Sequence, residues 1–497
     1  MDTAPAHDRS GTTLPGTADV VVLGAGIAGL TAACRLAEAG RDVVVLEAGQ
    51  VAAGVSGNTT AKVTAQHGLR YDRLVRNKDL AGAAEYAAAQ LEALEWIERG
   101  VGSGGVDCSF QRVSTWIYST RPQDREAYAK EAQACRRVGL AATLLTETPL
   151  PFPVAAAVRV DGQAQFHPRR WLLHLAERVE AAGGSIVEQC RATRVDGSTV
   201  VTTRGVVTGR DVVVATHFPI LDRAGFFARL EPIRDLVVSG PVDPARAPEG
   251  AFLCTSESRS VRTVPRDDGS TDLIVGGENY RVGTRTDVLE RHRALASWAQ
   301  EWFGVTSVTH RWSAHDLVTP DGMMYAGRYH PAADHLWVAT GFNLWGMTGG
   351  TAAGLLVADL VEGRADQERA ALFNPSRADI DQVPGLVKDN AVVARHLVGD
   401  LASAATRQLE FEELAPGQSR VGRVGSRLVA AHRADDGALH AVDARCTHLG
   451  CTVSFNDAER SWDCPCHGSR YALDGSVLHG PAVEPLAPVD EAVATQP

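Results

Sequence analysis

The alternation of apolar and polar residues near the start of the chain predicts a strand, a helix and a second strand. Residues 19–23 and 43–46 contain continuous apolar runs, which are typical of strands buried in a parallel sheet. Residues 27–39 lie between them, have the composition of a helix and end before a glycine, a common residue at helix C-termini. We therefore expect a β-α-β unit at residues 18–49, and hence an α/β fold with parallel strands.

The rest of the chain divides into a long α/β part and a short β-rich part. Helices are expected at residues 81–99 and 170–182, and strands at residues 185–187, 211–215, 236–239 and 273–276. A further strand at residues 336–341 leads through a glycine-rich turn to a helix at residues 351–360. Residues 366–405 are charged and are expected to form a helical connector. From residue 406 to 497, short strands and many turns predict a small antiparallel-β domain.

The composition indicates an ordinary globular protein of about three folding units. The chain has 497 residues, of which 44% are hydrophobic and 22% charged. Its net charge of −11 argues against a nucleic-acid partner, because nucleic-acid binding relies on basic patches. Residues 1–17 are mostly polar and small, and we expect them to form a disordered tail.

Neither a membrane span nor a signal peptide is expected. The most apolar stretch, residues 20–39, is interrupted by glycines and by charged residues, whereas a span needs about 20 predominantly apolar residues. The first residues lack a basic start followed by an apolar core. We therefore expect a cytoplasmic protein.

A glycine-rich motif joins the first strand to the first helix. Residues 24–29 read Gly-Ala-Gly-Ile-Ala-Gly, in which Gly24 permits a tight turn and Gly26 lets a pyrophosphate approach the backbone. Gly29 allows the helix and strand to pack closely, and the helix N-terminus favours phosphate. Glu47, which ends the second strand, is placed to accept hydrogen bonds from ribose hydroxyls. A dinucleotide site is favoured over a glycine-rich turn without a ligand, but the motif alone does not distinguish FAD from NAD.

Two later segments resemble the glycine oxidase/D-amino-acid oxidase (DAO) family of FAD-dependent oxidoreductases. Residues 56–62 (SGNTTAK) are similar to the second flavin loop of that family, and residues 339–350 (ATGFNLWGMTGG) to its C-terminal glycine loop. Residues 211–216 are similar to another strand of these folds, although His217 stands where a glycine is usual. The resemblance covers residues 18–365 and implies FAD as the cofactor.

The resemblance also implies how the chain is divided between two interleaved domains. The fold class expected is a Rossmann-like FAD-binding domain interleaved with a mixed-sheet substrate domain, followed by the small β domain. The flavin segments are expected at about 18–95, 180–225 and 310–365, and the substrate domain at about 96–180 and 226–310. The residues expected to bind FAD are Gly24, Gly26, Ile27, Ala28, Gly29, Glu47, Ala48, Thr59, Thr60, Lys62, Gly341, Gly346, Met347, Thr348 and Gly349. His67 is a possible covalent attachment point, but a histidine near the flavin or in the core is favoured, and we expect non-covalent FAD.

Four of the nine cysteines lie close together near the C-terminus, in two Cys/His boxes. Cys446 and His448 form the first box, and Cys464 and His467 belong to the second. Two thiolates and two imidazoles are the ligand set of a Rieske [2Fe–2S] cluster. The same set can hold zinc, although the spacing does not fit the usual zinc finger.

The segment from residue 406 to 497 resembles the Rieske family closely, including Trp462 and the Gly480-Pro481 pair. The resemblance implies a [2Fe–2S] cluster and a disulfide between Cys451 and Cys466. It also implies that the hydroxyls of Ser469 and Tyr471 donate hydrogen bonds to the cluster and its ligands, which raises the reduction potential.

The combination of the two resemblances predicts a flavin-dependent dehydrogenase or oxidase. Substrate oxidation at a C–N bond of an amine or amino acid is the leading hypothesis, with electrons passed one at a time from FAD to the Rieske cluster and on to an external one-electron acceptor. The alternative is an electron-transfer or redox-sensing flavoprotein, or a reductase in which the cluster feeds the flavin. An oxygenase is disfavoured, because the one close histidine pair in the middle, His330 and His335, sits beside a proline in an expected loop.

Residues that contact the small-molecule substrate are the least defined part of the prediction. Trp345, Asn343, Trp312 and His315 lie in or near the family-like segments, and Glu278 ends a strand directed toward the same region. Each is a weak candidate, since a core position is the commoner role. Hydride transfer to a flavin needs no acid or base when the amine arrives neutral, so no catalytic residue is assigned.

Overall fold

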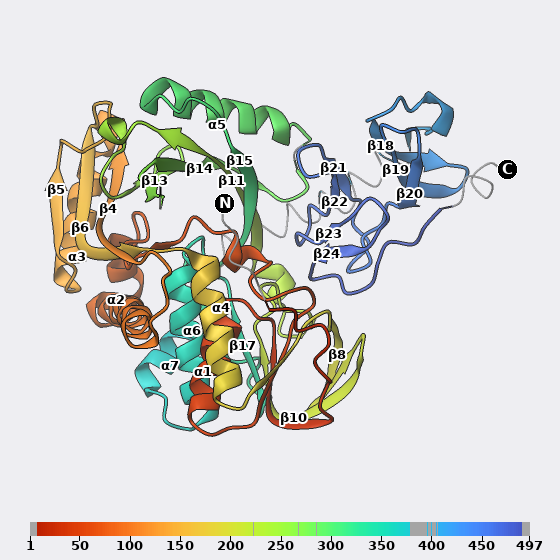
Figure 1. Cartoon of the computed structure of the whole chain (residues 1–497), viewed down its shortest axis with the longest axis horizontal. Coiled ribbons are helices and arrows are strands. Elements are labelled where there is room, and N and C mark those ends of the chain that lie inside the picture. The colour runs from red at the N-terminus through yellow and green to blue at the C-terminus, as the bar shows by residue number, and fades with distance from the viewer. Residues whose placement is uncertain are drawn as a thin grey trace.

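The computed structural model of the protein describes residues 7–221, 223–266, 268–284, 286–377 and 406–489, with the single positions 395, 399 and 404. Two large β-sheets with their helices form the main body, and the C-terminal residues form a separate small β domain beside it (Figure 1). This architecture confirms the predicted fold class.

The first sheet is the predicted, mainly parallel α/β sheet, with the strand order β16-β17-β10-β1-β2-β7. Strand β9 also pairs with β10, and β8 pairs with β9. Its strands are β1 (Thr17–Leu23), β2 (Val43–Leu46), β7 (Ser185–Val187), β8 (Ala192–Asp196), β9 (Thr199–Thr202), β10 (Gly205–Val214), β16 (Tyr325–Arg328) and β17 (Leu336–Thr340). The helices α1 (Ile27–Glu38), α4 (Pro168–Ala181) and α6 (Gly346–Val361) pack on one face. Val20 and Val22 face these helices, whereas Val21 and Leu23 face the core beneath β8 and β9. Burial on both faces explains the unbroken apolar run.

The second sheet is mixed and has the order β15-β11-β14-β13-β12-β4-β6-β3, with β5 paired to β6. Its strands are β3 (Lys62–Val63), β4 (Gln111–Ser119), β5 (Ala142–Leu145), β6 (Ala156–Gln165), β11 (Glu231–Val242), β12 (Ala251–Cys254), β13 (Arg259–Pro265), β14 (Thr271–Arg281) and β15 (His310–Val318). Helix α5 (Val288–Phe303) covers β11 and β14, and α3 (Arg125–Arg137) packs against β5 and β6. Strand β15, which lies within the expected flavin segment 310–365, therefore belongs to the second sheet and not to the first.

The C-terminal domain consists of two small antiparallel sheets. One contains β18 (Ser419–Val424), β19 (Arg427–Arg433) and β20 (Leu439–Asp443), and the other contains β21 (Ser454–Asn456), β22 (Ser461–Asp463), β23 (Arg470–Tyr471) and β24 (Val477–His479). The second of these sheets lies next to β11 and β15 of the main body, while the first lies farther out (Figure 1).

Two helices begin five or more residues earlier than predicted. Helix α2 (Tyr71–Gly104) starts ten residues before the expected helix, and its helical conformation is broken at Asp79, where φ is 60°. Helix α6 starts at Gly346, so the expected glycine-rich turn forms its first turn. Glycines lower helix propensity, but at Gly350 a Cβ would lie only 2.6 Å from Ile27 Cγ2, so no larger residue fits there.

The expected disordered tail is ordered where the structure describes it, from residue 7 onward. The Arg9 side chain is 4% exposed, and its Nε donates to Glu180 Oε1 at 2.6 Å. An ion pair between buried Arg9 and the more exposed Glu180 therefore holds this segment against the domain. Residues 1–6 lie outside the described residues. So does most of the expected connector at 366–405, of which α7 (Gln367–Phe373) is the first part.

Among the described helices, none is long and apolar enough to cross a membrane.

Candidate functional site

The glycine-rich turn between β1 and α1 has the backbone geometry that a phosphate cradle needs. Gly24 has a φ of +102°, and a Cβ at this position would lie 2.5 Å from the Ala215 carbonyl oxygen. A Cβ on Gly29 would collide with the Gly24 carbonyl. Only glycine fits these two positions, so the turn brings the N-terminus of α1 to the edge of the parallel sheet.

Glu47 closes this end of the site from the tip of β2. Its carboxylate accepts hydrogen bonds from the Ala25 N–H and the Gly49 N–H, both at 2.8 Å. Burial raises the pKa of Glu47, and the two backbone donors act in the opposite direction. The side chain is thereby fixed beside the glycine turn, as the ribose role requires.

A cavity of about 500 Å³ runs from this turn toward the second sheet. Its lining includes the following residues that the sequence predicts to bind the cofactor: Gly24, Gly26, Ile27, Ala28, Glu47, Ala48, Thr59, Thr60, Gly346 and Met347. The cavity thus joins the first motif, the second loop and the start of α6, which are far apart in the sequence. Gln189 and Arg191, which sequence reasoning did not single out, also line it.

Five predicted cofactor residues do not line the cavity and instead support its walls. They are Gly29, Lys62, Gly341, Thr348 and Gly349. Thr348 Oγ1 donates to the Thr64 carbonyl at 2.9 Å, and Lys62 Nζ donates to Thr60 Oγ1 at 3.0 Å. Burial lowers the pKa of Lys62 to about 7.

His67 lies behind the cavity wall. Its ring nitrogens contact the Tyr86 hydroxyl at 2.6 Å and the Thr64 carbonyl at 2.7 Å, and its ring stacks on Trp345 with 4.7 Å between centroids. Both nitrogens are engaged by protein groups, and the residue does not line the cavity. The arrangement accords with a packing role rather than with covalent attachment.

The substrate candidates separate into residues that reach the cavity and residues that do not. His315 lines it, together with Asp235 and Asp316. Asn343 is buried and bonded to Thr319, and Trp345 packs on His67, so neither reaches the cavity. Two further candidates are engaged elsewhere: Glu278 pairs with Arg259 and Arg291, and Trp312 Nε1 donates to the Asn58 carbonyl.

Asp235 is a buried carboxyl group in the wall of the cavity. It lies on β11, and its Oδ1 is buried without a hydrogen-bond partner among the described residues. Burial raises the pKa of Asp235 to about 7, against the opposing charge of nearby Lys62. A carboxyl group with a pKa near neutrality can take up or release a proton at working pH.

The second site lies in the small domain, where the two Cys/His boxes meet. The rings of His448 and His467 are 4.9 Å apart between centroids, and Cys446 Sγ is 3.1 Å from the Tyr471 hydroxyl. Hydrogen bonding, first from Cys464 and then from Tyr471, lowers the pKa of the Cys446 thiol. The predicted set of two cysteines and two histidines is therefore gathered in one place.

These residues fit a metal cluster on their own chemistry. His467 is buried, and neither of its ring nitrogens has a hydrogen-bond partner among the described residues. Burial lowers the pKa of His467 to about 3, so its ring is neutral, as a metal ligand must be. A buried imidazole without partners is costly, and coordination to iron removes that cost.

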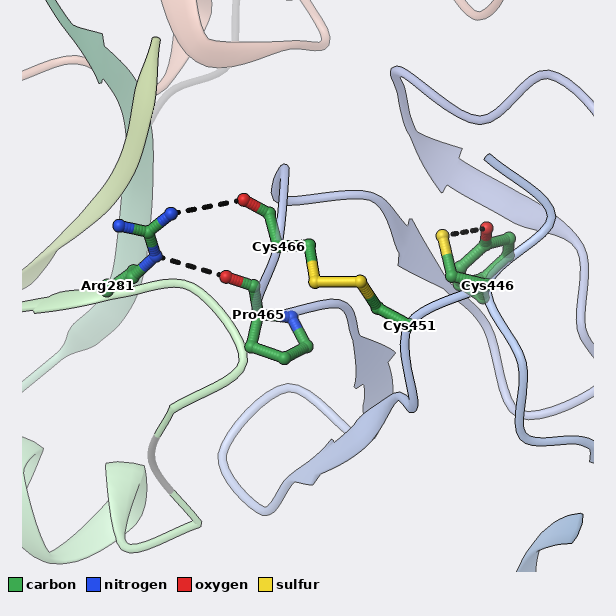
Figure 2. The surroundings of a disulfide bond; sticks show 6 residues. Arg281, Cys446, Cys451, Pro465 and Cys466 are labelled. Carbon is green, nitrogen blue, oxygen red and sulfur yellow. Dashed lines mark hydrogen bonds between the residues drawn. A yellow bond between two sulfur atoms is a disulfide. The ribbon is translucent and has the colours of Figure 1, made fainter. Parts of the chain in front are cut away.

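A disulfide joins the two cluster loops, as the resemblance implied. Cys451 and Cys466 are bonded, and Arg281 of β14 donates to the carbonyl oxygens of Pro465 and Cys466 at 3.1 and 3.2 Å (Figure 2). Ser469 Oγ accepts a hydrogen bond from the Ala482 N–H at 3.0 Å, so its hydroxyl proton is available for another acceptor. The cluster loops are thus held both by their own disulfide and by the main body.

The small domain packs directly on the flavin side of the molecule. The His467 ring lies 6.2 Å from that of Phe218 and 5.9 Å from that of Phe227. Residues 477–480 of the small domain also line the large cavity. Sequence reasoning did not predict this docking, because the two surfaces are separated by more than 200 positions.

Three histidines meet where the two parts join, and this cluster was also missed as a unit. His217 follows β10, His315 lies on β15 and His479 ends β24. His217 Nδ1 is 3.1 Å from His479 Nε2. The one signal in the sequence was His217 in place of a glycine, and it adopts the positive φ of 66° that such a position requires.

The fold and these sites define an oxidoreductase that combines a dinucleotide cofactor with a two-cysteine, two-histidine iron–sulfur centre. Two family models match the chain: FAD dependent oxidoreductase (DAO) over residues 19–360 and the Rieske [2Fe-2S] domain over residues 406–491. The protein therefore belongs to the DAO family of FAD-dependent oxidoreductases and carries a C-terminal Rieske domain. Its cofactors are FAD and a Rieske [2Fe–2S] cluster.

Relatives match either the whole chain or one of its parts. The YhfW protein of Bacillus subtilis (strain 168), a Rieske 2Fe-2S iron-sulfur protein by name, is 34% identical over 482 residues, which is 95% of this chain and 93% of YhfW. Gamma-glutamylputrescine oxidoreductase of Escherichia coli (strain K12) is 24% identical over 71% of this chain and 85% of its own length. Glycine oxidase from Geobacillus kaustophilus shares the fold, with a TM-score of 0.60, 21% identity, and coverage of 73% of this chain and all of the other.

Proposed function

We propose that this protein oxidises a C–N bond of an amine or amino acid at FAD and delivers the electrons through its own Rieske domain to an external one-electron acceptor. When bound, FAD accepts two electrons from the substrate and the cluster carries electrons singly. The observation that carries the proposal is the cavity itself, which is lined both by the flavin loops and by residues 477–480 of the Rieske domain.

The main body supplies the groups that bind the flavin. The turn at Gly24 and Gly26, with the N-terminus of α1, is placed for the pyrophosphate. Glu47 is placed for the ribose, and Thr59 and Thr60 line the path to the second sheet. The N-terminus of α6 at Gly346 favours negative charge at the flavin ring.

The small domain supplies the cluster ligands and their hydrogen bonds. Cys446, Cys464, His448 and His467 would hold the two irons, and the Tyr471 hydroxyl is directed at Cys446. Docking in the same chain is supported by the burial of His467 against the main body. The first cluster loop is open to solvent at Leu449, which is next to His448 and 45% exposed, and we assign the acceptor to this place.

Asp235 is the group that we assign to the substrate proton. It faces the cavity from β11, and its unpartnered oxygen is free to accept a proton or to pair with an ammonium group. An amine must lose its proton before a hydride leaves the adjacent carbon, so a carboxylate at this place serves the proposed reaction.

The names of the relatives support the substrate class. Glycine oxidase and gamma-glutamylputrescine oxidoreductase are both named for small compounds that contain amine nitrogen. We further propose that the flavin and substrate domains together span residues 18–365 and that the Rieske domain begins near residue 406.

The test is anaerobic mixing of the purified holoprotein with a panel of amines and amino acids, with flavin absorbance and cluster EPR recorded together. We expect one compound to bleach the flavin and then to produce the signal of a reduced Rieske cluster. A Cys464→Ser variant, which lacks a cluster ligand, should show the bleaching without the EPR signal. If no compound reduces the flavin while a chemically reduced cluster does so, the protein is a reductase or a sensor and the proposal is wrong.

A further inference from the structure

The strongest feature that the flavin and cluster assignments leave unexplained is the histidine cluster between the two domains. One ring nitrogen from each of His217, His315 and His479 lies within 4.8 Å of the other two. All three residues line the cavity, and none of them is one of the four residues assigned to the Rieske cluster. We propose that these three histidines bind a divalent ion of a first-row transition metal, such as Zn²⁺, in addition to the Rieske iron.

His315 gives the most direct support. It is 3% exposed, and neither of its ring nitrogens has a hydrogen-bond partner among the described residues. A buried polar group in this condition is costly unless something binds to it. The rings of His479 and His217 lie beside it, with 4.5 and 5.2 Å between centroids, so a partner that several imidazoles can share fits this place.

His217 and His479 point nitrogen atoms at each other across the domain boundary. The distance from His217 Nδ1 to His479 Nε2 is 3.1 Å. Two imidazole nitrogens in this position either share one proton or direct both lone pairs at one cation. Because His315 adds a third imidazole at the same point, the cation accounts for more of the arrangement than the shared proton does.

Asp316 orients His217 from the opposite side of the ring. Its Oδ1 is 3.4 Å from His217 Nε2, while its Oδ2 accepts a hydrogen bond from the Leu344 N–H at 2.6 Å. A carboxylate behind a ligating histidine is the usual outer partner of a metal site, because it fixes the ring and strengthens the nitrogen as a donor. Because the Leu344 N–H holds the Asp316 carboxylate in place, the His217 ring is oriented for metal binding before the metal arrives.

The ligand set indicates which metals fit. Three imidazoles suit Zn²⁺, Cu²⁺, Ni²⁺ and Fe²⁺ rather than Mg²⁺ or Ca²⁺, which prefer oxygen ligands. Three protein ligands leave a further position for a water or a substrate atom, as in catalytic zinc sites. Since His479 comes from the Rieske domain and the other two from the main body, bound metal also stabilises the docked arrangement.

The experiment measures Zn²⁺ bound to the full-length holoprotein after chelator treatment, added Zn²⁺ and gel filtration. Metal content is determined by mass spectrometry, acid-labile sulfide counts the clusters, and flavin absorbance counts FAD. We expect one Zn²⁺ per chain beyond the cluster iron. His315→Gln and His479→Gln should each weaken Zn²⁺ binding by more than tenfold, and Asp316→Asn by about 10- to 100-fold.

The control is His310→Gln, which changes a histidine on the same strand, β15, outside the cluster. It should bind Zn²⁺ like the wild type, and every variant should retain FAD and two sulfides per chain. The proposal is wrong if the wild type binds no Zn²⁺, or if the variants bind as much as the wild type. It is equally wrong if Zn²⁺ binds only to FAD-free protein, because the flavin then fills the space. None of these outcomes affects the test of amine oxidation.

Discussion

At the scale of single residues, we expect the Tyr471 hydroxyl to raise the reduction potential of the cluster. It lies 3.1 Å from Cys446 Sγ, and a hydrogen bond to a ligand thiolate stabilises the reduced form. We expect Tyr471→Phe to lower the reduction potential by about 20–65 mV, which corresponds to the usual net strength of one hydrogen bond for a one-electron couple. An EPR-monitored redox titration measures the shift.

The matched control for this change is Tyr128→Phe. Its hydroxyl bonds to Thr255 Oγ1 at 2.7 Å in the main body, so removing it should leave the potential unchanged. An unaltered potential in Tyr471→Phe would show that the hydroxyl makes no hydrogen bond to the ligand in the holoprotein.

The Asp235 carboxyl group gives a second prediction at this scale. Because burial raises its pKa to about 7, it is an effective base only when the pH is at or above that value. We expect kcat/KM of the wild type for an amine substrate to fall as the pH drops below 7. Asp235→Asn should lower kcat/KM by about 100-fold. In this variant, kcat/KM should no longer fall as the pH drops below 7. Asp243→Asn, in the turn after β11, is the control and should keep the wild-type profile.

The sequence predicts roles for Gly24, Glu47 and the cluster ligands, since these residues belong to short motifs with fixed spacing. The place of Asp235 in the cavity and the meeting of His315 with His479 could not be predicted. These contacts join β11, β15 and β24, and no local pattern records which distant strands are neighbours.

At the scale of elements, the position of the flavin loops depends on how closely α1 and α6 approach. A Cβ on Gly354 of α6 would lie 2.6 Å from the Ala28 carbonyl oxygen and 2.8 Å from Thr31 Cβ. Gly354→Ala must push the helices apart, so we expect it to destabilise the protein by about 1–3 kcal/mol. It should also weaken FAD binding, because the N-termini of both helices line the cofactor cavity.

Urea unfolding and FAD fluorescence titration measure the two effects. The control is Gly102→Ala in α2, an exposed helical glycine with no atom within 4 Å of the added Cβ. Here alanine should stabilise the helix by up to about 1 kcal/mol. Equal behaviour of the two variants would contradict the close-packing argument.

Sequence patterns predict where strands lie in the chain, but not which strands pair. The apolar runs predicted β1, β2, β10 and β17 because each is buried on both faces within one sheet. The expected flavin segment 310–365 is instead divided between the sheets, since β15 pairs with β11 along nine residue pairs. Strand pairing depends on long-range register, whereas the local pattern gives only the presence of a strand.

At the scale of the whole molecule, a network of charges joins the Rieske domain to the main body. Glu459 of the small domain accepts hydrogen bonds from Arg234 and Ser313 of the second sheet, and Arg470 approaches it from its own domain. Arg234 is 2% exposed, so its charge depends on Glu459 for compensation. The network fixes the cluster beside the flavin cavity.

Glu459→Gln tests this network. Although burial opposes its ionisation, Arg234 and Arg470 hold the pKa of Glu459 below its usual value. The carboxylate therefore stabilises the docked fold fully above its ordinary pKa of about 4.3, and this contribution is lost as the pH falls through the lower folded value. With its side chain 23% exposed, we expect Glu459→Gln to cost about 1.5–3 kcal/mol at pH 7.

Urea unfolding followed by the visible circular dichroism of the cluster measures this loss. The difference between wild type and Glu459→Gln should be constant from pH 6 to 8 and should shrink toward zero as the pH falls below 4. Glu413→Gln removes a carboxylate that pairs with Arg420 at 3.4 Å on the surface, where both side chains are exposed, and should cost less than about 1 kcal/mol at any pH. If the Glu459 variant were as stable as this control at pH 7, the domains would have to be held together by the apolar contacts of Phe218 and Phe227 and by Arg281 rather than by the charge network.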